Sequence, residues 1–514
     1  MLKLKNNMNI YVILIIYFSI NILFLTGFPF VHSDEAWLAG LSRTIVQESD
    51  YGVTEPFFDL YPRSPHAIKV IFNTIQILFF KILGYQIFTF RLISLLFAVV
   101  ALYFFHKVAY FLTDSDLISL LGTILLAVDI QFIYTSHLAR QEIILIAIFL
   151  AGLYYFLIKV LKNNNKKNNL FLGLIIVFAI GIHPNSFIIF LPFVFIYLYY
   201  ILFSDKLSFN DFFVFIFTVS LGALGFVLLS LYFDPNFIAN YSSYGETLGV
   251  FDSLAAKLDG LDYFYQKLFY QVSGTYFTPD IRLQFYLFGI ILFYSLVKTF
   301  LKKDSINHIL LLSFIAVNLG FILIGRFNQT SIIFIFPIIY LLLINTLSNI
   351  EINYTKTFII ALILIIAINS MIVIYNNSYF NYDDYLKEIS LKVDKDDIVL
   401  ANLNSQFYFD YNKLYDYRNL AYLTENGLTF SQYIEKNNIE YIIYPEEMDF
   451  IYNSRPKWND LYGNIYLYYG DLQRFLDEEC RLVHVFTNKT YGIRIARYIG
   501  EEAWKVKIYK VKAE

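Results

Sequence analysis

Charged residues are scarce in this sequence. Only 16% of its 514 residues are Asp, Glu, Lys or Arg, whereas 58% are hydrophobic. A soluble domain carries about 25% charged residues because water must wet its surface, so this chain needs lipid as part of its solvent. The formal net charge of −3 offers no basic face to phosphates. We therefore expect no nucleic-acid partner.

Cysteine is almost absent. The single cysteine, Cys480, excludes an internal disulfide framework and a metal site built from several thiolates. No segment repeats with a fixed period, and the tract of lysine and asparagine at 162–169 is typical of a solvated loop. The long apolar runs are therefore the main structural signal.

Apolar runs of near-spanning length recur over the first 375 residues. They predict a mostly α-helical, polytopic transmembrane bundle of about eleven spans. The first run follows two lysines, as in a signal peptide, but it is long enough to span and no cleavage pair of small residues follows it. We therefore interpret it as a retained span. The predicted spans are 10–25, 90–112, 116–135, 141–160, 170–185, 187–204, 211–233, 284–300, 307–325, 330–348 and 356–375.

Lysines in the short loops predict the orientation of the chain. The loops at 162–169, 204–206 and 298–304 are lysine-rich, as cytoplasmic loops are. This predicts a multi-pass protein of the cell (cytoplasmic) membrane with a cytoplasmic N-terminus. The outer loops 28–89 and 234–283, and everything after about 376, would then be extracytoplasmic.

Two regions outside the predicted spans carry their own signals. Residues 67–84 are apolar on most faces with lysines near both ends, which favours a helix lying at the membrane surface, although an extra span would also fit. Beyond the membrane domain (1–375), residues 376–514 alternate charges with short apolar runs. The runs 396–402 and 440–445 predict strands, and 430–438 predicts a helix between them. This region is therefore predicted to be a small α/β domain.

The first candidate site is HSDEAW, residues 32–37, just after the first span. Asp34 and Glu35 stand side by side at the outer face, where acidic residues must either meet water or serve a function. The alternative is structural, because Ser33 or Asp34 could cap a surface helix beginning at Glu35.

Cationic residues at the same predicted face are candidates for binding a phosphate. Arg140 in HLARQE enters an apolar run beside Glu142, and the fork of an arginine makes paired hydrogen bonds to phosphate. Pairing with Glu142 or contact with lipid headgroups would also explain it. His183 in the turn GIHPNS, Arg326 in GRFNQ and Arg91 in FTFRLISLLF are further candidates.

A divalent metal such as Mg or Mn is a further option for this face. The four histidines predicted there, His32, His66, His137 and His183, could combine with nearby carboxylates. No pair of ligands has a diagnostic spacing, so no cofactor is assigned. The candidate metal ligands are Asp34, Glu35 and His183, with Glu142, His66 and Asp59 as candidate supporting residues.

The order of these motifs resembles the C-type membrane glycosyltransferases (GT-C), in particular the protein O-mannosyltransferases and the bacterial aminoarabinose transferases. The resemblance rests on an Asp–Glu pair after the first span, then YPRSPH, GYQIFTFRLISLLF and HLARQE, and it ends at GRFNQTSIIFIFP. It covers about the first 340 residues. YPRSPH departs from the lysine–proline–proline run of the aminoarabinose branch, so that substrate is not carried over.

The resemblance implies an activity and roles for the residues. Such enzymes move a sugar from a polyprenyl-phosphate carrier (undecaprenyl or dolichyl) to a protein, lipid or glycan acceptor at the outer face, with inversion. Asp34 stands where the family has its catalytic base, and Glu35 beside it is assigned to the same catalytic pair. Glu35 and His183 would also orient groups or bind metal. Arg140 and Arg326 match family arginines that would meet the lipid phosphate.

Two other functions remain open from the sequence. A transporter or flippase of lipid-linked sugars usually shows repeated halves and broken helices near the bilayer midplane. Here the polar residues cluster at one face, which favours a surface-facing enzyme. A non-catalytic membrane protein of envelope assembly is the other alternative.

Overall fold

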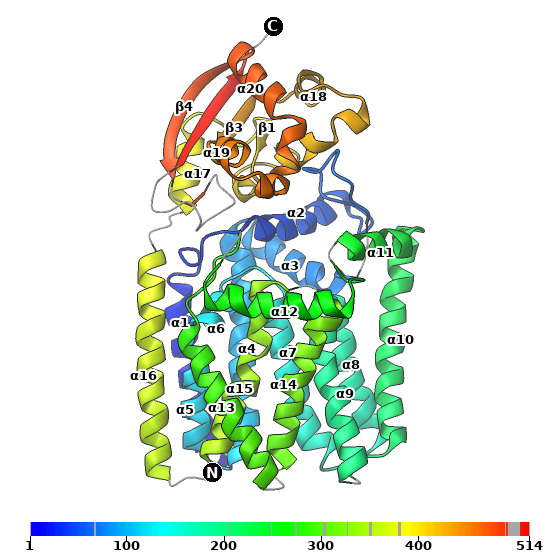
Figure 1. The fold of residues 1–514 in the computed structure, drawn as a ribbon, viewed down its shortest axis with the longest axis vertical. Coiled ribbons are helices and arrows are strands. Elements are labelled where there is room, and N and C mark those ends of the chain that lie inside the picture. Colours follow the sequence, from blue (N-terminus) through cyan, green and yellow to red (C-terminus); the bar gives the residue numbers. More distant parts are fainter. Residues whose placement is uncertain are drawn as a thin grey trace.

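The computed structural model has two parts, a bundle of long helices and a smaller unit that contains a sheet (Figure 1). The long helices run side by side, and the N-terminal end of the chain lies at the far end of the bundle from the C-terminal unit. The structure describes residues 2–65, 68–204, 206–247, 249–272, 275–301, 305–325, 327–348, 352–378, 382–488, 490–491 and 504–512.

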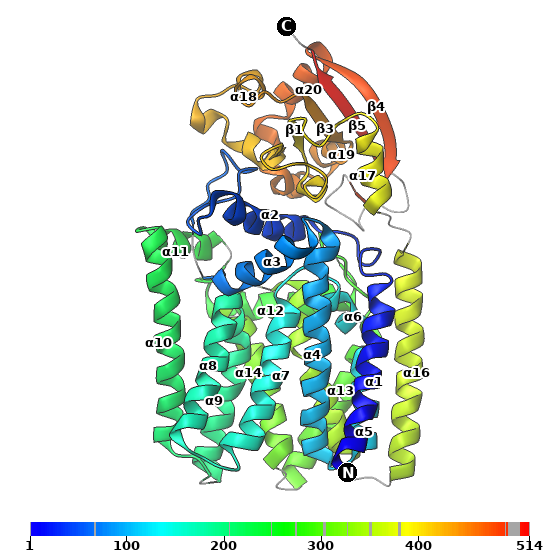
Figure 2. The same cartoon turned by 180° about the vertical axis from the view of Figure 1, so that it is seen from behind.

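The bundle contains helices from most of the first 377 residues. Its helical segments, some of them short continuations of a longer helix, are α1 (Leu2–Ile22), α4 (Ile87–Thr113), α5 (Asp116–Ala127), α6 (Ile130–Ser136), α7 (Glu142–Tyr155), η1 (Phe156–Val160), α8 (Lys166–Ile182), α9 (Ser186–Phe203), α10 (Phe209–Phe233), α13 (Arg282–Leu301), α14 (Ser305–Ile324), η2 (Gln329–Phe334), α15 (Phe336–Leu347) and α16 (Ile352–Asn377). Four helices instead lie across the end of the bundle near the C-terminal unit (Figure 2). These are α2 (Ser33–Glu48), α3 (Val70–Leu83), α11 (Phe237–Thr247) and α12 (Leu254–Phe269).

Every predicted span coincides with helix, but fewer helices are long and apolar enough to cross a membrane. Within the described residues there are seven, or eight if the bent pair α5 and α6 forms one span. The predicted number of about eleven spans is too high by this measure. The apolar part of α1, Asn9–Ile22, is short, and α8 has only 17 residues.

The helices at the centre of the bundle are much more buried than those at its rim. The stretch from η2 through α15 is wholly enclosed by other helices, whereas the apolar windows of α10 and α16 are only 11% and 17% buried. These two helices stand at opposite edges in Figure 1. Exposed apolar side chains at such edges are stable only in contact with lipid. The predicted polytopic membrane fold is therefore confirmed.

The predicted surface helix at 67–84 is α3, which has 14 residues and lies crosswise over the bundle. It packs against α2, α4 and α8. Its length is too short to cross a bilayer, since a spanning helix needs about 20 residues. The alternative of an extra span at this place is therefore wrong.

The C-terminal unit is built on a mixed sheet with strand order β2-β1-β3-β5-β4. The strands β1 (Val399–Ala401) and β3 (Tyr441–Pro445) fall within the predicted strands, and α18 (Phe430–Lys436) within the predicted helix. β1 runs parallel to both β2 and β3, and β5 is antiparallel to both of its neighbours. The remaining elements are α17 (Tyr382–Ser390), η3 (Leu403–Ser405), β2 (Leu414–Asp416), η4 (Tyr417–Tyr422), η5 (Thr424–Asn426), α19 (Glu447–Ser454), η6 (Pro456–Tyr462), η7 (Ile465–Leu467), α20 (Tyr469–Glu478), β4 (Cys480–Asn488) and β5 (Trp504–Val511).

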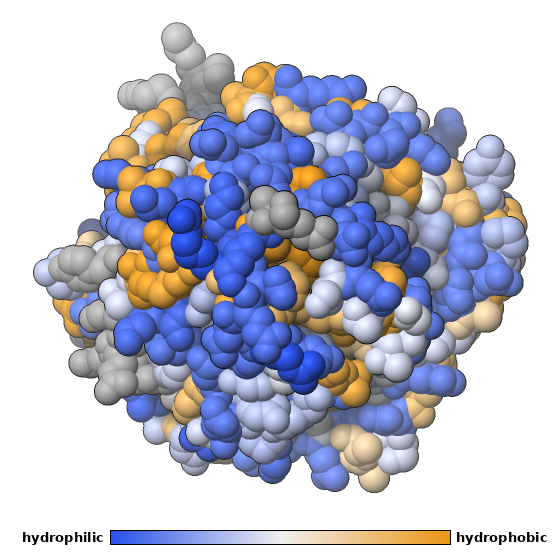
Figure 3. Space-filling view, turned by 90° about the horizontal axis from the view of Figure 1, so that it is seen from above, coloured by the Kyte–Doolittle hydropathy of each residue, from blue (hydrophilic) through white to orange (hydrophobic). Residues whose placement is uncertain are grey.

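The C-terminal unit is fixed to the loop between α2 and α3. The side-chain amide of Asn419 donates to the carbonyl of Phe57 at 2.7 Å, and its oxygen accepts from the backbone N–H groups of Leu60 and Tyr61 at 3.2 Å. The backbone N–H of Asp416 also donates to Phe57 at 3.1 Å. The opposite face of the unit is mostly hydrophilic (Figure 3), as expected of a surface that meets water.

Candidate functional site

Asp34 is held in place by the first turn of α2. The backbone N–H of Asp34 donates to Nδ1 of His32 at 3.0 Å, and the carboxylate of Glu35 accepts from the backbone N–H of His32 at 3.0 Å. This reciprocal pair is a capping box, which satisfies two amides that a helix start would otherwise leave unpaired. The cap is therefore His32 rather than the predicted Ser33 or Asp34, and the carboxylate of Asp34 takes no part in it.

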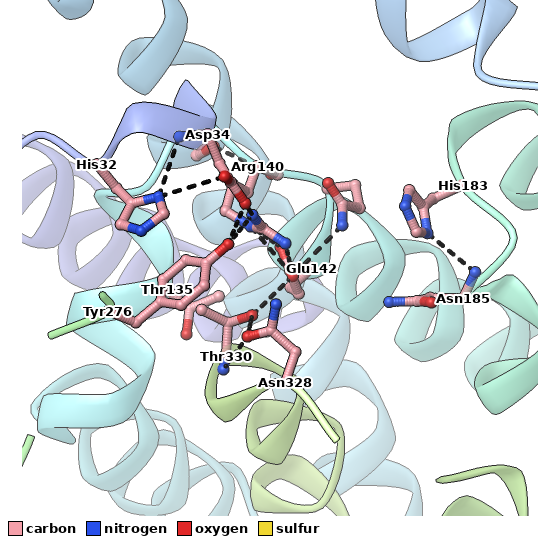
Figure 4. Close-up of polar contacts among 12 residues, drawn as sticks. His32, Asp34, Thr135, Arg140, Glu142, His183, Asn185, Tyr276, Asn328 and Thr330 are labelled. Atoms are coloured by element: carbon pink, nitrogen blue, oxygen red, sulfur yellow. Dashed lines mark hydrogen bonds and ion pairs between the residues drawn. The ribbon is translucent and has the colours of Figure 1, made fainter. Parts of the chain in front are cut away.

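The carboxylate of Asp34 meets two side chains from distant parts of the chain. Arg140, in the loop before α7, donates from Nη1 to Oδ2 of Asp34 at 2.5 Å. The hydroxyl of Tyr276, in the loop between α12 and α13, donates to the same oxygen. The guanidinium of Arg140 also lies 5.1 Å from the centre of the Tyr276 ring. Figure 4 shows the three side chains converging.

A second carboxylate anchors Arg140 from behind. Nη2 of Arg140 lies 3.1 Å from Oε1 of Glu142, which also accepts from the hydroxyl of Thr330 at 2.8 Å. Burial alone would lower the pKa of Arg140, but the neighbouring Glu142, Tyr276 and Asp34 outweigh it and raise that pKa. Arg140 therefore stays charged and bridges a buried carboxylate, Glu142, to a partly exposed one, Asp34.

Tyr276 acts as a neutral donor in this cluster. Burial raises the pKa of its phenol well above the ordinary value, with Asp34 adding to the effect against Arg140. Its ring stacks on that of His32, with centroids 3.9 Å apart. His32 thus packs against the tyrosine of this cluster and Glu142 against its arginine. The side chain of Asp34 remains 28% exposed.

This exposed side of Asp34 opens on a cavity of about 640 Å³. The volume is within the range of small-molecule sites. Its lining includes three acidic residues, Asp34, Glu55 and Asp234, and three basic ones, Arg63, Lys69 and Arg140. Aromatic side chains from α11 and the segment after it form another part of the wall, at Phe237, Tyr241, Tyr244 and Phe251.

Arg63 is a rigid part of the cavity wall. Its guanidinium makes two hydrogen bonds of 3.1 Å to Glu55 and lies 4.7 Å from the centre of the Trp37 ring. Arg418 of the C-terminal unit also packs on Trp37, at 4.8 Å. Burial opposes ionisation of Glu55, but Arg63 holds the pKa of that carboxyl below its ordinary value. The C-terminal unit thus supports a wall that it does not itself line.

His183 lines the same cavity from the turn between α8 and α9. Its Nδ1 accepts from the backbone N–H of Asn185 at 3.0 Å, which fixes the ring. Figure 4 shows His183 set apart from the Asp34–Arg140 cluster. The structure therefore brings His183 to the cavity but not into contact with Asp34.

Two predicted site residues pair with each other instead of facing the cavity. Arg91 is fully buried, and its guanidinium makes hydrogen bonds of 2.9 and 2.8 Å to Glu35. Its remaining hydrogen bonds go to the backbone carbonyls of Leu25, Pro29 and Phe30. The predictions of phosphate binding by Arg91 and of a catalytic role for Glu35 are therefore wrong, because neither side chain can reach a ligand.

Asp59 also lies elsewhere than predicted. It accepts from the hydroxyl of Tyr433 at 2.8 Å and thus joins the outer loop to α18 of the C-terminal unit. Burial raises the pKa of this carboxyl. Asp59 supports the contact between the two parts of the molecule, and not the cavity. The candidates Arg326 and His66 lie outside the described residues.

The candidate metal ligands are not brought together. Glu35 is bound by Arg91, His183 is separate, and Asp34 is met by a guanidinium, which a divalent cation would have to displace. Within the part of the chain that the structure describes, no group of three or more His, Cys, Asp or Glu side chains could hold a metal ion. The residues present do not fit the predicted Mg or Mn site.

The sequence interpretation missed several lining or contacting residues. Tyr276 is one of 44 tyrosines and carries no local motif that would distinguish it. Arg63 was visible in YPRSPH but was used only for the resemblance. Its acidic partner Glu55 stands eight residues earlier in the same outer loop.

Comparison with known proteins agrees with this fold. Residues 69–233 match the family model described as dolichyl-phosphate-mannose-protein mannosyltransferase. Solved structures of membrane glycosyltransferases share the fold. The chain therefore has the fold of these membrane enzymes, and about a third of it matches the mannosyltransferase model, in line with the resemblance drawn from its motifs. No curated protein sequence matches it.

Individual structures show how far the likeness extends. ArnT from Cupriavidus metallidurans, bound to undecaprenyl phosphate, matches with a TM-score of 0.62 and 9% identity over 98% of both chains. The Archaeoglobus fulgidus oligosaccharyltransferase, in complex with Zn and sulfate, matches with a TM-score of 0.54 and 14% identity, over 93% of this chain and 72% of that one. AglB from the same organism, with an inhibitory peptide and a dolichol-phosphate, gives 0.51 and 12% identity over 97% and 76%. At these identities the likeness extends to the fold alone.

Proposed function

We propose that this protein transfers a sugar from a polyprenyl-phosphate donor to an acceptor at the extracytoplasmic face of the cell membrane, with Asp34 as the base. The observation that carries the proposal is the placement of Asp34, a partly exposed carboxylate fixed by Arg140 and Tyr276 at the wall of a large cavity. The neighbours named above bind a polyprenyl phosphate in two cases, which supports this donor class.

The reaction would be a single displacement. The oxygen or nitrogen of the acceptor attacks the anomeric carbon of the sugar and forms the new bond. As it does so, Asp34 takes the proton from that hydroxyl or amine. The bond from that carbon to the phosphate oxygen breaks, and the lipid phosphate leaves with the electron pair. Because attack and departure occur on opposite faces of the carbon, the configuration inverts.

Charged side chains of the cavity would act on both the base and the leaving phosphate of this displacement. Arg140 donates to Asp34 and holds that carboxylate in place at the wall of the cavity. The leaving phosphate gains negative charge and needs cationic partners. Arg140, Lys69 and His183 line the same cavity, and we assign the phosphate to this set, together with Arg326. The acceptor would be a protein, lipid or glycan.

The test is sugar transfer from radiolabelled polyprenyl-phosphate donors in membranes that contain wild-type protein or Asp34→Asn. Removal of a general base should slow transfer by roughly two to four orders of magnitude without loss of folded protein. Asp59→Asn is a matched control, because it changes a carboxylate of the same outer region that faces away from the cavity. Equal transfer by wild type and Asp34→Asn would remove Asp34 as the base, and no transfer from any donor would favour a flippase or an assembly protein.

A further inference from the structure

Asn73, on α3, presents a buried acceptor without a partner. Its side chain is 4% exposed, and its Oδ1 has no hydrogen-bond partner among the described residues. The neighbouring polar residues of the same helix are satisfied. Gln76 accepts from Ser42 at 2.7 Å, and Thr74 donates to the carbonyl of Val70 at 2.7 Å. An unpaired buried carbonyl costs free energy, so its persistence points to a ligand.

A small recess lies beside the main cavity, and Asn73 lines both. Its volume is about 10 Å³, close to the minimum of about 10–15 Å³ that one water-sized group occupies. The recess and the main cavity share lining residues, including Glu55, Arg63 and Asn73. The recess and the main cavity therefore adjoin at these side chains, and Asn73 borders both.

The chemistry of the recess selects a hydrogen-bond donor. The carboxylate of Glu55 accepts from Arg63 and from the indole N–H of Trp37, so both of its oxygens have donors. Oδ1 of Asn73 is left as an acceptor. A hydroxyl or amino group fits both this acceptor and the size of the recess, whereas a carboxylate or phosphate would bring acceptors against an acceptor.

The position of the recess along α2 suits a sugar. Asp34 and Leu41 both line the main cavity, and Leu41 also lines the recess. Seven residues of helix separate them, a rise of about 10 Å. This span is comparable to a sugar ring with its substituents when side-chain lengths at both ends are included.

We propose that this recess binds a hydroxyl or amino substituent of the donor sugar, with Asn73 as the residue that accepts its hydrogen bond. The proposal rests on the proposed function and adds the feature of the sugar that the site recognises. It makes Asn73 a determinant of specificity, because a site built around a hydrogen bond rejects an analogue that lacks the donor group.

One test needs no substrate. Asn73→Leu removes the unpaired carbonyl at nearly the same volume, so the purified protein in detergent should unfold at an equal or higher temperature. Asn318→Leu is the matched control. Asn318 accepts from Tyr265 at 2.5 Å and donates to the carbonyl of Phe314 at 2.9 Å, so its loss should lower Tm. A drop in Tm for Asn73→Leu as large as that for Asn318→Leu would overturn the proposal, because it would reveal a structural role.

The second test measures selectivity with decaprenyl-phosphate mannose and its 2-, 3-, 4- and 6-deoxy analogues, or the same series of any sugar that wild type transfers. Wild type should disfavour one deoxy analogue by about tenfold to hundredfold in kcat/KM. Asn73→Leu should lose that preference by transferring the parent sugar more slowly while leaving the analogue unchanged. A uniform change over all donors, with transfer still dependent on Asp34, would overturn this inference alone. Absence of transfer from every donor would overturn the proposed function as well.

Discussion

Asp34 and Glu35 are adjacent in the sequence, and each meets an arginine from a later segment, yet their two ion pairs differ in surroundings. Arg91 and Glu35 are both fully buried, and backbone carbonyls take the remaining donors of the arginine. Arg140 and Asp34 lie at a cavity, with Asp34 28% exposed. The first pair is closed to ligands and holds the backbone around the start of α2. The second pair is open to ligands.

The contrast shows what distinguishes a structural acid from a reactive one in this fold. A buried pair with every hydrogen bond satisfied is costly to break and has no capacity for a further partner. In the open pair, Arg140 is also bound by the buried carboxylate of Glu142, which fixes its position. The carboxylate of Asp34 stays accessible from the cavity. Accessibility, more than charge, separates the two neighbours.

The largest effect should follow from breaking the closed pair. Arg91→Met leaves the charge of Glu35 buried without its partner, which should destabilise the protein by about 3–5 kcal/mol. The double variant Arg91→Met with Glu35→Gln should recover part of this loss. The measurement is the amount of folded protein extracted from membranes and its Tm. Arg282→Met, which breaks an exposed pair with Asp280, should change neither. A stable, fully active Arg91→Met protein would contradict the structural role.

A smaller effect, on rate, is expected at the open pair. Arg140→Lys keeps the charge but loses the fork that reaches both Asp34 and Glu142, and one charge-assisted hydrogen bond corresponds to roughly tenfold to hundredfold in kcat. Stability should fall much less than in Arg91→Met. The comparison of kcat and Tm for these two variants checks the distinction directly. If Arg140→Lys mainly lowered Tm at unchanged kcat, both pairs would be structural.

The smallest effect should come from the neutral donor of the open pair. Tyr276→Phe removes the hydroxyl that donates to Asp34 while the ring that stacks on His32 remains. We expect kcat to fall by about fivefold to tenfold, the upper part of the range for one ordinary hydrogen bond from a neutral donor, with KM for the donor and Tm nearly unchanged. Steady-state transfer kinetics measure both parameters. A change confined to KM would indicate that Tyr276 contacts the substrate instead.

The membrane fold and both members of the open pair were predictable from the sequence. Residues that end or begin spans must lie at a membrane face, so Asp34, Arg140 and Glu142 could be assigned to one side from hydropathy alone. The closed pair was not predictable, because the carbonyls that enclose Arg91 belong to a loop whose path has no sequence signature. The contacts of Tyr276 and Asp59 could not be predicted for a similar reason. Their partners depend on the path that each long loop takes over the bundle.

The attachment of the α2–α3 loop to Asn419 has a consequence for the order in which the site is completed. This loop carries Glu55 and Arg63, and its anchor lies more than 350 positions later in the chain. Synthesis proceeds from the N-terminus, and domains fold as they emerge. The membrane helices are therefore present well before the anchor is made, and the cavity wall stays untethered until the C-terminal unit has folded. An unfinished chain thus already contains Asp34, while the loop that carries Glu55 and Arg63 still lacks its attachment to Asn419.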